Sequence, residues 1–168
     1  MKKVLLAIGG IAPSKKVFSY AVELCERIRA ELDILQIIRP KQYREYLKRV
    51  RQGSHHAKGY IERTMTAAAF AEAGEHELAK EIEAQALESF RSLLPESERA
   101  GVPCHLTMKS GHPDEEVLNY TKEHRDVVLT IYDLPKEEEN DRSLGSSKKR
   151  LLREIKDHIP TPLVMMRG

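Results

Sequence analysis

The sequence lacks tryptophan, and aromatic residues make up only 5% of its 168 positions. Proteins that bind single-stranded nucleic acid stack the bases on aromatic side chains, so this scarcity argues against such a surface. The formal net charge is also small, at +2, and it gives no general electrostatic reason to bind nucleic acid or a membrane. We therefore expect no nucleic acid partner.

Long apolar runs and a leader segment are absent as well. No stretch approaches the ~20 apolar residues that a transmembrane helix requires, and the apolar run near the amino terminus soon meets Gly9 and Gly10. The two cysteines, Cys25 and Cys104, are far apart and outside any CxxC spacing, which is typical of buried, reduced thiols. These features predict a cytoplasmic protein with no membrane span.

Short apolar runs alternate with amphipathic stretches along the chain. Runs that are apolar throughout are typical of strands buried on both faces of a parallel sheet. Five segments read as strands, at residues 4–8, 32–38, 102–109, 127–132 and 163–166. Between them Ser14 caps one predicted helix, Pro113 begins another and Pro160 ends a third. The sequence predicts a single α/β domain over residues 1–168, with helices on both faces of the sheet.

The segment between the second and third strands contains no strand pattern. Residues 41–52 form a basic amphipathic stretch, and helical patterns follow at 60–73 and 75–94. Gly74 is expected to interrupt or bend the helix and Pro95 to stop it. Residues 41–74 are therefore a helical insertion. It is either an arm that docks a protein partner or an accessory element that covers the sheet rim or a dimer.

Three stretches of sequence indicate a family. They are the opening VLLAIGG with the PSKKVFSYAVELCERIRAELDILQI that follows, the turn SGHP at residues 110–113, and the ending GSSKKRLLREIKDHIPTPLVMM. In these stretches the chain resembles the universal stress protein family over almost its whole length. The resemblance implies a five-stranded parallel sheet with strand order 3-2-1-4-5. It also implies a homodimer formed through the last strand, which consists here of Leu163, Val164, Met165 and Met166.

Many members of that family bind ATP or AMP, and others do not. The nucleotide-binding members share Gly-x2-Gly-x9-Gly-Ser/Thr after the fourth strand and an aspartate at the end of the first. When the motif is matched at Gly145 and Ser146, its two earlier glycines fall on Tyr132 and Pro135, and the aspartate falls on Gly9. Neither tyrosine nor proline gives the backbone the freedom that glycine provides near a phosphate. Residues 133–142 also carry five acidic and two basic side chains, a net charge of −3 that would repel a triphosphate.

Some positions remain that could bind a nucleotide. Gly9 and Gly10 precede a helix and could hold a phosphate on backbone N–H groups, or they could form a plain turn. The segment from Gly145 through Ser146 and Ser147 could hold an anion or simply cap a helix. An adenine base would then lie near two apolar strand residues, Ile37 and Ile131. Retained ATP or AMP binding is therefore the alternative to a module that binds no nucleotide by the usual route.

The evidence for catalysis or metal binding is weak. Ser146 and Lys149 satisfy S-x-x-K, but the partner motifs of that chemistry are missing. Adjacent histidines at 55–56 and three glutamates at 137–139 lack the spacing of a metal site. We therefore expect a binding or regulatory module that is not an enzyme, with no metal and no firmly indicated cofactor.

Overall fold

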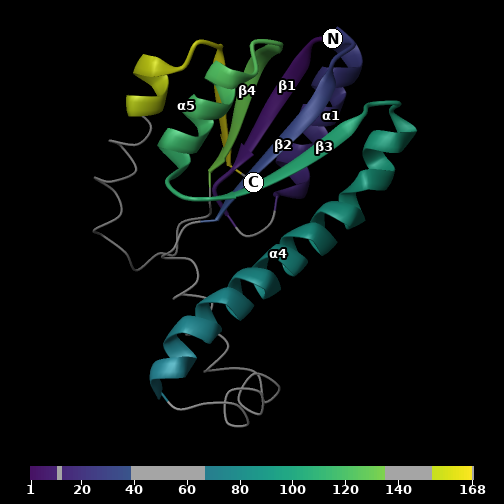
Figure 1. Ribbon diagram of the computed structural model, residues 1–168. Helices are drawn as coiled ribbons and strands as arrows, with labels where there is room; N and C mark the ends of the chain where they lie inside the picture. Colours follow the sequence, from purple (N-terminus) through teal and green to yellow (C-terminus); the bar gives the residue numbers. More distant parts are fainter. Residues whose placement is uncertain (11–12, 39–66, 135–152, 168) are drawn as a thin grey trace.

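The computed structural model describes residues 1–10, 13–38, 67–134 and 153–167, with the backbone alone at 67–79. Five parallel strands form one sheet in the order β3-β2-β1-β4-β5, which confirms the predicted strand order (Figure 1). Their bounds are β1 Lys3–Ile8, β2 Glu31–Ile38, β3 Cys104–Ser110, β4 Val127–Leu134 and β5 Leu163–Arg167. The predicted helix at 41–52 and the segment 145–147 lie outside the described residues.

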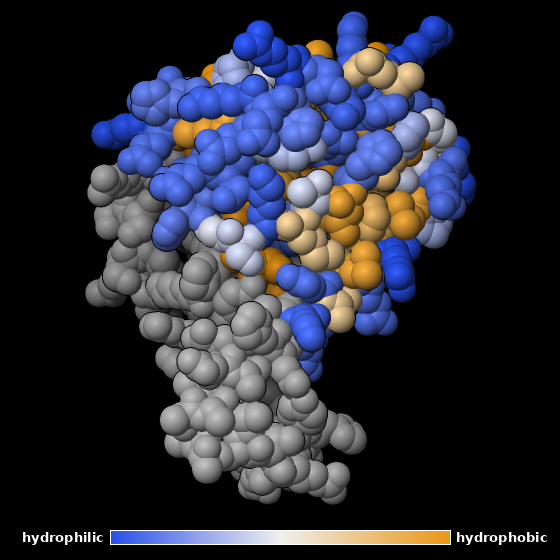
Figure 2. All heavy atoms as spheres, viewed as in Figure 1, coloured by the Kyte–Doolittle hydropathy of each residue, from blue (hydrophilic) through white to orange (hydrophobic). Residues whose placement is uncertain are grey.

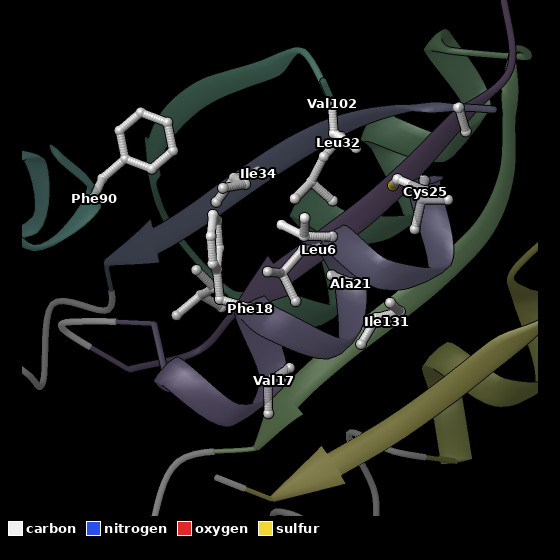
Figure 3. Packing of buried hydrophobic residues seen from close by; sticks show 14 residues of the cluster. Leu6, Val17, Phe18, Ala21, Cys25, Leu32, Ile34, Phe90, Val102 and Ile131 are labelled. Carbon is white, nitrogen blue, oxygen red and sulfur yellow. The ribbon is translucent and has the colours of Figure 1, made fainter. Parts of the chain in front are cut away.

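Two hydrophobic clusters lie on opposite faces of the sheet. Helix α1, Lys15–Ile28, presents Val17, Phe18, Ala21, Val22 and Cys25 to the first cluster (Figure 3). Helix α5, Pro113–Glu123, contributes Val117 and Tyr120 to the second. Alternate residues of each central strand supply the two clusters, because successive side chains of a strand point to opposite faces. The sheet is thus covered on both sides, as the continuous apolar runs predict.

The face shown in Figure 2 is mostly hydrophilic, and the largest group of apolar residues lies right of centre in the view. The thiol of Cys25 is fully buried, and the burial raises its pKa to about 12. The expectation of a buried thiol is therefore confirmed for Cys25, whereas Cys104 is half-buried.

Helix α4, Ala67–Arg99, differs from the prediction because it continues through both Gly74 and Pro95 (Figure 1). The expected stop at 95 is therefore wrong, and the helix is not interrupted at 74. Proline loses its own N–H and its ring crowds the carbonyl four residues earlier, but the N–H groups that follow are intact, so the next turn still forms, with the Ala100 N–H donating to the Glu96 carbonyl at 3.2 Å. The buried Ser97 and Val102 anchor this last turn against the core.

The strand ends also differ slightly from the prediction. Strand β3 begins at Cys104 rather than at residue 102, and β4 continues to Leu134 rather than ending at Tyr132. Asp133 therefore belongs to a strand and pairs with Met166 of β5. This places its carboxyl group at the sheet rim where ligands bind in such folds.

Candidate functional site

The two described ends of the segment between β1 and α1, residues 9–10 and 13–14, are bound by side chains from both neighbouring strands. On one side, the Gln36 Nε2 amide of β2 donates to the Gly10 carbonyl. On the other, the Asp133 Oδ2 atom of β4 accepts a hydrogen bond from the Ser14 backbone N–H at 2.9 Å. Both side chains are almost completely buried, with exposed fractions of 1% for Gln36 and 5% for Asp133.

The register of the sheet explains this arrangement. Ile8, the last residue of β1, pairs with Gln36 on one side and with Asp133 on the other. Gln36 shares its face with Ile34, and Asp133 shares its face with Ile131, so both point to the side of the sheet that α1 covers. The chain crosses to this side as it enters α1. Gln36 and Asp133 therefore lie on either side of β1 at its carboxyl-terminal end.

Ser14 connects this segment to the helix. It is the N-cap residue of α1, with extended backbone angles, and its hydroxyl oxygen accepts from the Val17 N–H at 3.5 Å. This confirms Ser14 as the predicted cap. Its own backbone N–H faces the carboxylate of Asp133, which contributes negative charge at the positive end of the helix dipole.

Burial also determines the protonation behaviour of Asp133. Loss of solvent raises the pKa of this carboxyl group, and the hydrogen bond from the Ser14 N–H partly offsets the rise. The site thus combines a buried acid, a backbone donor and a helix terminus. A helix terminus with a free N–H can bind an anion, but in this structure the Ser14 N–H already binds the Asp133 carboxylate.

The residues predicted to bind a ligand are only partly brought together. Gly9 is buried and Gly10 half-buried, and both lie in the segment described above. Ile37 and Ile131 are fully buried but belong to different clusters: Ile37 lies on the α5 face and Ile131 on the α1 face. The structure therefore does not place them around one base, because the sheet lies between their side chains. Gly145, Ser146 and Ser147 lie outside the described residues.

Tyr132 occupies the face opposite to Asp133. Its exposed fraction is 1%, and it packs in the second cluster with Ala7 and Leu35. Tyr132, which stands at a glycine position of the family motif, therefore packs in the core on the α5 face of the sheet.

Sequence reasoning missed Gln36 and assigned Asp133 to a loop. One available signal was Leu134, because an apolar residue directly after Asp133 is consistent with a strand that continues past Tyr132. For Gln36 the signal was a polar residue inside a largely apolar strand, since a buried amide requires a hydrogen-bond partner. Its hydrogen-bond partner, the Gly10 carbonyl, lies 26 residues away in the sequence, so no local sequence pattern indicates it.

A second polar group lies at the amino-terminal ends of the strands, away from the rim. The Tyr120 hydroxyl donates to Asp33 Oδ2 at 2.9 Å, and the Lys3 Nζ lies 3.5 Å from the same oxygen and 3.3 Å from Asp126 Oδ2. The Tyr120 ring stacks on His124 with centroids 4.0 Å apart. We interpret this group as structural, because its members are paired with one another.

Two other kinds of site are absent from the described part of the chain. Its histidine, cysteine, aspartate and glutamate side chains form no group of three that could bind a metal ion. None of its helices is both long and apolar enough to cross a membrane.

The comparisons with known proteins identify the family. The model of the universal stress protein family matches residues 1–156. The chain belongs to this family. No curated protein sequence matches it significantly.

Solved structures of universal stress proteins share the fold at low sequence identity. UspA from Lactobacillus plantarum is 14% identical with a TM-score of 0.59, and the match covers 99% of this chain and 97% of that one. The protein MJ0577 is 13% identical with a TM-score of 0.61, over 99% and 96% of the two chains. A family member from Arabidopsis thaliana, determined with AMP bound, is 16% identical with a TM-score of 0.53, over 99% and 92%. These likenesses establish the fold, which is that of the universal stress proteins.

Proposed function

We propose that this universal stress protein is a non-enzymatic binding or regulatory module in which ATP binding by the usual route is impaired. The observation that carries the proposal is the Asp133 carboxylate, 2.9 Å from the Ser14 N–H at the start of α1. A phosphate at this helix terminus would meet a buried negative charge and a donor that is already used. The loss of glycine at Tyr132 and Pro135 supports the same conclusion from the sequence.

The absence of catalysis is part of this proposal. At the rim, the buried ionisable group among the described residues is Asp133, and its hydrogen bond goes to a backbone N–H rather than to a nucleophile. A general base normally acts on a hydroxyl, thiol or water within hydrogen-bond reach. The geometry of Asp133 suits a fixed charge better than a proton acceptor in a reaction.

Adenine nucleotide binding without hydrolysis is the second candidate. Family structures that resemble this chain contain AMP, dAMP or cAMP. A monophosphate brings less charge to Asp133 than ATP does, so AMP is the nucleotide more compatible with this rim. Gly9 and Gly10 of the described residues, and the Gly145–Ser147 segment outside them, remain the candidate phosphate contacts.

The protein is also proposed to act as a cytoplasmic homodimer. Strand β5 is an edge of the sheet, and Leu163, Val164, Met165 and Met166 are all half-buried rather than covered. An apolar edge strand is normally protected by pairing.

A protein partner could additionally bind the basic insertion at 41–74, and deletion of that segment without loss of partner binding would contradict this role.

The experiment that tests the proposal is mass spectrometry of ligands released from the purified full-length chain. It is combined with thermal shift measurements at millimolar ATP and AMP. We expect no co-purified ATP and no shift with ATP. Stoichiometric ATP in the purified protein would overturn the proposal, and co-purified AMP would favour the second candidate.

A further inference from the structure

We draw no further inference here: the strongest candidate, the surface patch of half-buried apolar side chains that β4 and β5 present on the α1 face of the sheet, Leu129, Val164 and Met166, carries none, because nothing in the described residues shows what covers it.

Discussion

Asp33 and Asp133 are both buried carboxylates, but their partners differ. Asp33 accepts a hydrogen bond from Tyr120 and lies 3.5 Å from the Lys3 ammonium. The partner of Asp133 is a backbone N–H at a helix terminus. A carboxylate with a cationic neighbour is stabilised by the charge of that neighbour, whereas Asp133 depends on the peptide dipoles of α1.

Replacement of Lys3 by methionine should destabilise the fold. The Lys3 side chain is 23% exposed and that of Asp33 is 3% exposed. Removal of one partner of a fully buried pair costs about 3–5 kcal/mol, and the partial exposure of the lysine reduces the expected loss to about 1–3 kcal/mol. Urea unfolding measures this change.

Lys2→Met is the matched control, because Lys2 is exposed and no ion pair involves its side chain among those found in the described residues. Equal losses in both variants would refute the role of the pair.

The stability of the protein should carry a pH-dependent contribution from Asp133. Burial raises the pKa of this carboxyl group in the folded state above its ordinary value of 3.8. The folded state therefore binds the proton more readily than the unfolded state does. The contribution of this group is fully present below about pH 3.8 and is lost as the pH rises through the raised pKa.

Asp133→Asn tests this sign, because it removes the titration and keeps an acceptor for Ser14. The free energy of unfolding is measured for both proteins between pH 3.5 and 7, a range set by the pKa of carboxyl groups, about 4. The difference, wild type minus variant, should become more favourable to the wild type as the pH falls. A difference that is constant or changes in the opposite direction would show that the folded-state pKa is not raised.

At the scale of the elements, the end of α4 shows why a helix stop is hard to predict. Val102 donates to the Ser97 carbonyl at 2.9 Å, and Gly101 donates to the Glu98 carbonyl at 3.1 Å. Together with the positive φ of 68° at Gly101, these bonds form a Schellman motif, which satisfies the last carbonyls of a helix. Gly101 ends α4, while Pro95 lies inside it.

Substitution of Gly101 by alanine should lower stability by about 1–2 kcal/mol, the cost of a left-handed conformation for a residue with a Cβ. A Cβ at this position would meet no atom within 4 Å, so steric crowding contributes nothing. Thermal and urea unfolding measure the loss. Gly101→Asn is the matched control and should lose less, because asparagine tolerates this conformation better than alanine does. An alanine variant as stable as the wild type would contradict the capping role.

The elements that could be predicted from the sequence are those with strong local patterns. Continuous apolar runs located the strands, and the Ser14 cap located the start of α1. Family resemblance supplied the strand order. The Gln36 and Asp133 contacts could not be predicted, because they depend on strand register across 26 and 119 residues of sequence. Proline at 95 was misleading because its local cost is outweighed by packing of the following turn.

For the whole molecule, the two edges of the sheet have different surroundings. Strand β3 follows α4 directly, and its residues Cys104 and Leu106 pack with the carboxyl-terminal part of that helix against the first cluster. Strand β5 lies at the other edge, where β4 is its only strand partner among the described residues. The outer edge of β5 therefore presents backbone donors and acceptors that a second copy could pair with.

Light scattering of the full-length chain tests this pairing. A dimer of the 19.2 kDa chain has a mass of 2 × 19.2 = 38.4 kDa. Met165→Lys places a charge on the edge strand at a residue that packs in neither hydrophobic cluster, and edge lysines oppose strand addition, so this variant should have the mass of one chain. Val128→Lys is the matched control, because Val128 is an exposed valine, at 39%, on the adjacent strand β4. The control should remain a dimer, and thermal unfolding shows whether each variant is folded. A wild-type mass of 19.2 kDa at all concentrations would refute the dimer, and loss of the dimer in both variants would refute the assignment of the interface to β5.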